Sequence, residues 1–395
     1  MARLAPRLAL LARDLHRDPE LGTQELHAVS RIAGELEEEG LQVEVGVAGL
    51  PTSLRAMRAA GEGPSVAFFA EYDAIPSLGH AAGHNLLTAA SVGASIALSR
   101  ALGPVSGRVL LFGAPAEETI GGKVVMAMRG AFDGIDAALL AHPGHEDRAI
   151  VSTLASWSVE VLFEGRAAHA VADPTRGIDA LDALIRLFSA RNLLLSTLRP
   201  GTRMPGVILE GGVRPNLIPA RARARFSLRA ESAHYLVETV AVRFREIVAA
   251  VARETATHAQ VTPIDNLYDE MSSNAELAMI YSSCARDQGM NPQAGPGDII
   301  GSLDMGTVSH LVPALHPMFR IGDGSIASHT AEFTQLCASQ GGFDVAMRAA
   351  TALALTGLAV LTDRSALERM RRAHRDAVRD FSRAEVPLVT EQVEG

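Results

Sequence analysis

Carboxylate and imidazole side chains that could bind a metal ion recur along this sequence. They are Asp73, His84, the adjacent pair Glu117 and Glu118, His142 and His329. Nitrogen and carboxylate oxygen donors of this kind bind Zn²⁺ and similar divalent ions. One of two adjacent carboxylates can bind a cation while its neighbour accepts a proton from a water molecule. The set therefore predicts a hydrolytic metal site.

Short apolar runs alternate with helical segments around these residues. The runs are Ser65–Glu71, Arg108–Ala114 and Ala137–Ala141, and Leu86–Leu102 is a helix rich in small residues. Near-continuous apolar strands of this kind are typical of an α/β fold with a mostly parallel sheet covered by helices on both faces. Most of the candidate residues follow the ends of these strands, where the functional groups of open α/β sheets collect. One site can therefore contain them all.

The sequence pattern changes in the middle of the chain. Trp157–Glu164 alternates apolar and polar residues with a period of two, and a helix, two strands, a second helix and a last strand follow. This βαββαβ order predicts a ferredoxin-like α+β domain inserted into the first domain. We expect a discontinuous catalytic α/β domain at residues 1–154 and 267–395, and a lid and dimerisation domain at residues 155–266.

The composition limits the classes of function. The chain has 395 residues, of which 48% are hydrophobic and 21% charged, and its formal net charge is −9. It has no basic stripe with interleaved aromatic residues, which argues against a nucleic-acid partner and favours small molecules. The longest uncharged apolar run, Ala349–Leu361, is shorter than a bilayer requires and fits a buried helix, so we expect no membrane partner. Two distant cysteines, Cys284 and Cys337, suit a reducing cytoplasm.

Several longer motifs occur in a fixed order along the chain. They are Leu15–Leu21, Glu71–Pro76, Gly79–Asn85, Pro115–Glu118, Gly165–Ala170, Asn216–Pro219, Gly301–Gly306 and His329-Thr330. In these motifs the chain resembles the aminoacylase and carboxypeptidase family of co-catalytic metallopeptidases. The resemblance is to its amidohydrolase branch, which includes aminobenzoyl-glutamate hydrolase-like and dipeptidase-like proteins. It extends over about residues 8–363.

This resemblance implies a role for each candidate residue. Glu117 matches the general base that activates a metal-bound water, and Asp73 matches the aspartate that orients a metal ligand. The implied metal ligands are His84, Glu118, His142 and His329. The implied substrate-binding residues, which contact the substrate carboxylate or the tetrahedral oxyanion, are His169, Asn216 and Arg229. The resemblance also implies a homodimer formed through the lid, in which His169 reaches into the partner's site.

The chain departs from the family pattern at Ala82, where relatives have a metal-binding cysteine. Alanine has no donor atom, so the four implied ligands are enough for one catalytic ion with an open position but few for two. We therefore expect one divalent ion per chain, Zn²⁺ or Mn²⁺, rather than two. His80 is a weaker candidate for a replacement donor, because this histidine also occurs in relatives that keep the cysteine.

Three functions are compatible with these residues. The first is hydrolysis of the amide bond of an N-acyl amino acid or dipeptide-like substrate that carries a carboxylate. The second is a remodelled, metal-poor enzyme that catalyses amide formation, cyclisation or isomerisation in biosynthesis. The third is a non-catalytic binder of carboxylate ligands. The presence of Glu117 favours an enzyme over a binder, because a binder needs no general base.

Overall fold

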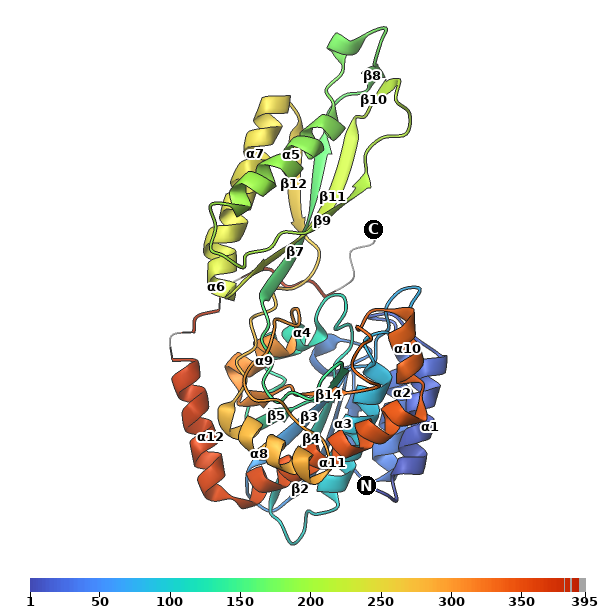
Figure 1. Ribbon diagram of the computed structural model, residues 1–395, viewed down its shortest axis with the longest axis vertical. Coiled ribbons are helices and arrows are strands. Elements are labelled where there is room, and N and C mark those ends of the chain that lie inside the picture. Colours follow the sequence, from blue (N-terminus) through green and yellow to red (C-terminus); the bar gives the residue numbers. More distant parts are fainter. Residues whose placement is uncertain (380, 384–385, 391–395) are drawn as a thin grey trace. The chain divides into compact units, whose positions relative to one another are not determined.

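The computed structural model describes residues 1–379, 381–383 and 386–390, which form two compact units (Figure 1). The first unit consists mainly of Met1–Thr153 and the described residues of Met271–Phe381. The second consists mainly of Leu154–Glu270 and the described residues of Ser382–Val389. The chain therefore leaves the first unit after residue 153 of 395 and later returns to complete it.

A mixed six-stranded sheet forms the centre of the first unit. In spatial order its strands are β1 (Gln42–Val45), β2 (Leu54–Ala60), β4 (Gly107–Gly113), β3 (Ser65–Ala70), β5 (Ala137–Leu139) and β13 (Ala314–Leu315). The β4–β3, β3–β5 and β5–β13 pairs are parallel, whereas β1–β2 and β2–β4 are antiparallel. Every residue of β3 is buried, so both faces of the sheet are covered there. The predicted α/β fold with a mostly parallel sheet is confirmed; the β1–β2 edge was not predicted.

Helices pack on this sheet and on one another. They are α1 (Ala5–Arg17), α2 (Leu26–Glu38), α3 (His84–Ser99), α4 (Gly122–Met128), α8 (Ala275–Asp287), α9 (Met305–Leu311), α10 (Ala331–Cys337), α11 (Gln340–Thr362) and α12 (Arg364–Ala377). Small residues let α11 approach α3 and β3: a Cβ added at Gly357 would lie 2.7 Å from Leu98 Cδ2 and 3.2 Å from Phe68 Cζ. By length and composition α11 would pass as a membrane span, but 61% of its most apolar window is buried, as in a core helix.

The second unit contains a four-stranded antiparallel sheet and its own hydrophobic core. The strand order is β12 (His258–Pro263), β7 (Ala155–Glu164), β11 (Arg221–Ala230) and β9 (Gly206–Glu210). Helices α5 (Ala180–Leu195) and α7 (Val242–Thr255) pack side by side on it (Figure 1). A short helix α6 (Ala233–Tyr235) and a π-helical turn lead into α7. Along the chain the main elements follow the predicted βαββαβ order.

Two short strand pairs lie outside the main sheets. In the first unit, β6 (His142–Gly144) pairs in parallel with β14 (Met318–Arg320). In the second unit, β8 (Ala168–His169) and β10 (Leu217–Ile218) form an antiparallel ribbon. Each pair carries one of the histidines singled out in the sequence, His142 on β6 and His169 on β8.

Gly83 sets the start of α3 and so the position of His84. Its φ is +84°, and a Cβ added there would lie 2.4 Å from Pro143 Cγ. We expect Gly83→Ala to lower the free energy of unfolding by about 1–3 kcal/mol, because a left-handed backbone and a clash both oppose the alanine. Chemical denaturation followed by circular dichroism would measure it.

The matched control for this prediction is Gly34→Ala in α2. A Cβ added at Gly34 has no neighbour within 4 Å. Alanine is the better helix former, so this change should be neutral or stabilise by about 0.5–1 kcal/mol. Equal losses of stability in the two variants would contradict the role assigned to Gly83.

Candidate metal centre

Carboxylates and imidazoles of the first unit meet beyond the ends of three strands. They are Glu71 and Asp73 after β3, Glu117 and Glu118 after β4, and His142 after β5. Because β3, β4 and β5 are parallel neighbours, these segments leave the sheet at the same edge. His84 lies among them: its Nε2 is 3.3 Å from Glu71 Oε2 and 4.0 Å from Glu117 Oε2.

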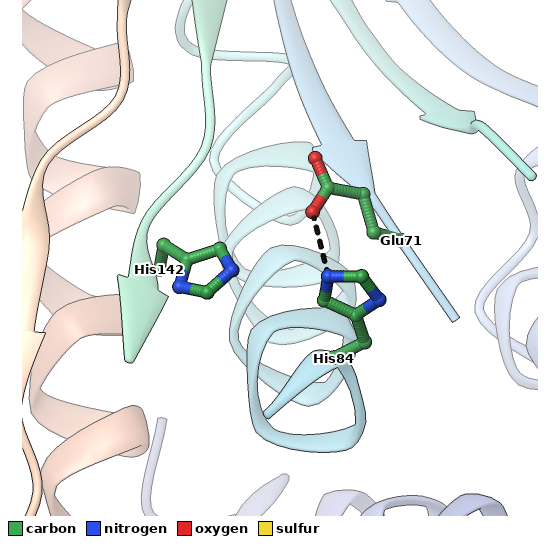
Figure 2. Close-up of side chains that lie close together, drawn as sticks. All are labelled: Glu71, His84 and His142. Carbon is green, nitrogen blue, oxygen red and sulfur yellow. Dashed lines mark ion pairs between the residues drawn. The ribbon is translucent and has the colours of Figure 1, made fainter. Parts of the chain in front are cut away.

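Two groups of potential metal donors are found among the described residues, and both include His84. Glu71, His84 and His142 form the first group, and His84, Glu117 and Glu118 form the second; the donor atoms of each group lie within 4.8 Å of one another. Figure 2 shows the first group, with Glu71 at the end of β3, His84 at the start of α3 and His142 on β6.

The donor atoms of the first group include two that are unsatisfied. Glu71 Oε2 and His84 Nε2 are buried and have no hydrogen-bond partner among the described residues. Buried polar atoms without partners are rare in native proteins and often mark an ion-binding position. The mixture of imidazole nitrogen and carboxylate oxygen suits Zn²⁺ or Mn²⁺. The residues present therefore fit a divalent metal ion.

Asp73 holds two parts of the site in place. Its backbone carbonyl accepts a hydrogen bond from His84 Nδ1 at 2.9 Å, and its Oδ1 lies 3.2 Å from the same nitrogen. Its Oδ2 accepts a hydrogen bond from the Glu118 backbone N–H at 2.9 Å. Burial opposes protonation of His84, but Asp73 and Glu71 raise the pKa of that imidazole well above its ordinary range. These contacts fit the orienting role that the family resemblance implies for Asp73.

His142 is positioned by its own backbone and by a second histidine. Its Nδ1 donates to the Pro143 carbonyl at 2.8 Å, and its ring stacks on that of His316 with centroids 5.5 Å apart. Burial lowers the pKa of His142, which favours the neutral ring that a metal requires. Burial also lowers the pKa of His316 to about 3. Sequence reasoning missed His316, because a single histidine between apolar residues carries no pattern.

Glu117 has the environment of an acid–base group. It follows a turn in which Ala116 has a φ of 60°, and its side chain is mostly buried. Burial and then the negative charges of Glu71 and Glu118 raise its pKa well above the ordinary value. A carboxylate with a raised pKa can both accept and return a proton near neutral pH.

His329 and His80 occupy less central positions. His329 Nε2 lies 3.4 Å from Glu118 Oε1, and the His329 side chain is 58% exposed. The hydrogen bond with Glu118 raises the pKa of His329. His80 is buried beside His16, with ring centroids 6.4 Å apart, and belongs to neither donor group. His84 thus links the four implied ligands, since it groups with His142 and Glu71 and also with Glu118, which in turn contacts His329.

A buried lysine lies behind the first donor group. Lys123 Nζ is 2.6 Å from Glu71 Oε1 and 2.5 Å from Asp304 Oδ1, and all three side chains are buried. Burial opposes the positive charge, but Asp304 and Glu71 raise the pKa of Lys123 above its ordinary value. Sequence reasoning missed this residue, although a lysine at the start of an apolar helix was a usable signal, because unpaired lysines are almost never buried.

Glu25 supports the turn that carries Glu117. Its Oε1 accepts a hydrogen bond from the Ala116 backbone N–H, and its Oε2 accepts one from Thr52 Oγ1, both at 2.8 Å. Burial and then the charge of Asp73 raise the pKa of Glu25 to about 7. Glu25 therefore fixes the site from behind without belonging to either donor group.

The three lid residues do not come together within one chain. His169 pairs with Leu217 in the β8–β10 ribbon, and the Asn216 carbonyl accepts from the Ala170 N–H at 3.0 Å, so His169 and Asn216 are neighbours. Arg229 lies near the other end of β11, where its Nε donates to Ser227 Oγ at 3.0 Å. The ribbon adjoins the start of β11 (Figure 1). The intervening strand is roughly 26 Å long at about 3.3 Å per residue.

Comparisons with known proteins agree with this architecture. Residues 151–256 match the model of a peptidase dimerisation domain. The chain is 34% identical over 384 residues to a mouse Xaa-Arg dipeptidase, covering 93% of this chain and 89% of the relative. It is 32% identical over 237 residues to one of the subunits of the Escherichia coli p-aminobenzoyl-glutamate hydrolase, covering 54% and 48%. A dinuclear metal-binding peptidase of the M20 family from Bacillus subtilis superposes with a TM-score of 0.67 at 20% identity, covering 91% and 99%.

The chain therefore belongs to the M20 peptidase family, which confirms the resemblance drawn from its motifs. It is a hydrolase that acts on dipeptide-like C–N bonds. The donor groups around His84 fit the divalent metal on which such a hydrolase depends.

We expect Glu25→Gln to change how stability depends on pH. Between pH 4.5 and about 7 the folded protein keeps the Glu25 proton that the unfolded chain has lost. This contribution to stability is complete below about pH 4.5 and is lost as the pH rises through 7, at about 1.4 kcal/mol per pH unit. Neutral glutamine escapes this loss, so the variant should exceed the wild type by about 3 kcal/mol at pH 8 and match it at pH 4.5. Urea denaturation at several pH values tests this; parallel profiles would contradict it.

Proposed function

We propose that this protein is a metal-dependent amidohydrolase that cleaves the amide bond of an N-acyl amino acid or dipeptide with a free carboxylate. The observation that carries this proposal is the buried meeting of Glu117 and Glu118 with His84 at the edge of the sheet. The names of the relatives, a dipeptidase and an aminobenzoyl-glutamate hydrolase, describe amides that end in an amino acid.

The donors around His84 are proposed to hold one ion per chain, because Ala82 offers no ligand. When bound, Zn²⁺ or Mn²⁺ supplies Lewis acidity that acidifies a water molecule and polarises the substrate carbonyl. The proposed ligands are His84, Glu118, His142 and His329. Asp73 keeps His84 Nδ1 engaged, so that Nε2 is the nitrogen presented to the site.

Glu117 is proposed to move the proton during the reaction. It takes a proton from the attacking water and later delivers it to the nitrogen of the leaving amine, so that the amide C–N bond breaks with a neutral leaving group. Its burial and raised pKa support this assignment. The turn at Ala116, held by Glu25, fixes the direction in which the carboxylate points.

The second unit is proposed to act as the lid and dimerisation domain, joined to a catalytic domain formed by residues 1–154 and 267–395. Its edge strand β9 exposes Val207, Ile208 and Leu209, and an apolar edge strand is open to pairing with a second copy. In such a homodimer, His169 and Asn216 of one chain complete the partner's site. Arg229 grips the substrate carboxylate with its guanidinium group.

We expect Glu117→Gln to lower kcat by about 10²–10⁴, because the amide cannot accept the proton of the attacking water. The assay is hydrolysis of a panel of N-acyl amino acids and dipeptides by the metal-loaded protein, with metal content measured by elemental analysis. Full turnover at unchanged metal content would show that Glu117 is not the base. A metal-loaded wild type that hydrolyses none of the amides would favour the remodelled enzyme instead.

We expect mixed dimers of His169→Ala and Glu117→Gln chains to recover activity. Each variant alone should be nearly inactive, since either the base or the histidine from the partner is missing. After equal mixing and subunit exchange, about a quarter of the sites combine an intact Glu117 with the partner's intact His169. Turnover near a quarter of the wild-type value supports action across the dimer. No recovery, with exchange verified by differently tagged chains, would place His169 in the site of its own chain.

A further inference from the structure

The two carboxylate oxygens of Glu71 have different surroundings. Its side chain is 2% exposed, and its Oε1 forms an ion pair with Lys123 Nζ at 2.6 Å. Its Oε2 points towards His84 Nε2 at 3.3 Å and has no hydrogen-bond partner among the described residues. Figure 2 shows this oxygen directed into the space between the two imidazoles. The carboxylate therefore presents to the metal centre one oxygen that is ion-paired with His84 and accepts no hydrogen bond from the described residues.

The imidazoles of His84 and His142 are also oriented to bind a metal ion through Nε2. His84 Nδ1 donates to the Asp73 carbonyl and His142 Nδ1 donates to the Pro143 carbonyl. A histidine that binds a metal through one nitrogen usually donates the other N–H to a carbonyl or carboxylate, which fixes the tautomer. In both rings Nε2 is therefore the nitrogen that can release its proton and bind a metal. The donor atoms of Glu71, His84 and His142 lie within 4.8 Å of one another.

We propose that Glu71 is a further metal ligand, which binds the ion beside His84 and His142 in a chain whose Ala82 has no donor. This inference rests on the proposed metal-dependent function and adds a ligand to it. Imidazole nitrogens together with carboxylate oxygens are usual ligands at a catalytic zinc ion. Glu71 was not singled out as a ligand from the sequence, because it continues the apolar run of β3.

Lys123 and Asp304 position this ligand. Lys123 Nζ holds Glu71 Oε1 and is itself held by Asp304 Oδ1 at 2.5 Å, while the Lys123 backbone N–H donates to Asp304 Oδ2 at 3.0 Å. The ion pair thus fixes the orientation of the Glu71 carboxylate and leaves Oε2 facing the imidazoles. The alternative is that Glu71 serves only as the counter-ion of Lys123 and His84, with no contact to a metal.

Isothermal titration of the metal-stripped, full-length protein with Zn²⁺, repeated with Mn²⁺, tests whether Glu71 is a metal ligand or only a counter-ion. We expect Glu71→Gln to raise the Kd by at least about 100-fold, beyond the 10–100-fold typical of losing a residue that only supports a ligand. Glu276→Gln is the matched control, because Glu276 is also buried and ion-paired, with Arg369 in α12, but belongs to neither donor group. Its Kd should stay within about threefold of the wild-type value.

A second pair of variants covers the case in which Glu71→Gln does not fold. Glu71→Gln/Lys123→Met removes the ion pair as a unit, and replacing both partners of a buried pair is often tolerated. Lys123→Met alone keeps the Glu71 carboxylate, so this single variant is the control for the double variant. The double variant should bind metal at least about tenfold more weakly than the single one.

The outcomes distinguish this inference from the function on which it rests. If the wild type binds metal and Glu71→Gln binds it equally well, Glu71 is a counter-ion and the inference is wrong, while the proposed function stands. Equal Kd values for Lys123→Met and the double variant lead to the same conclusion. A wild type that hydrolyses amides without any bound metal would overturn the metal-dependent function and the inference with it.

Discussion

The structure of the metal centre depends on balancing negative charge where water has little access. Glu71, Asp73 and Asp304 are each at most 1% exposed, and Glu117 lies beside them with a mostly buried side chain. A buried carboxylate without a partner costs several kcal/mol. Lys123 supplies one fixed positive charge, and His84 Nδ1 lies 3.2 Å from Asp73 Oδ1. The remaining excess of negative charge is what makes the site attractive to a divalent cation.

Backbone conformation places these charges. The parallel strands β3, β4 and β5 deliver their following residues to one edge, and residues with positive φ turn the chain sharply at Gly83 before α3 and at Ala116 before Glu117. Glu25, far away in sequence, then ties the Ala116 turn to the rest of the unit. His84 and Glu117 therefore follow short connections that are fixed by the surrounding structure, which limits the conformations of these side chains before any substrate binds.

Local pattern was enough to predict the buried strands and the acidic and histidine residues that follow them. β3, β4 and β5 are continuous apolar runs, and the alternation in Trp157–Glu164 identified β7. The β1–β2 edge was missed because β1 is largely exposed and β2 alternates only over its first three residues. Glu71, Lys123 and Asp304 were missed as a unit, because Lys123 and Asp304 are 181 residues apart in sequence and no local signal records a pairing of that kind. The separation of His169 from Arg229 depends on the pairing of β8 with β10, which places His169 at the far end of β11 from the arginine.

The interrupted course of the first unit has a consequence for protein synthesis. β5 ends at Leu139, but its neighbour β13 begins only at Ala314, after most of the second unit, Leu154–Glu270, has been made. At 5–20 residues per second, a ribosome needs roughly 10–35 s to cover that interval. During this time the β5 edge stays unpaired on the nascent chain, and Lys123 has no Asp304 to pair with. Translation speed and chaperones that shield exposed strands should therefore affect the yield of this protein more than that of a chain whose sheet is contiguous in sequence.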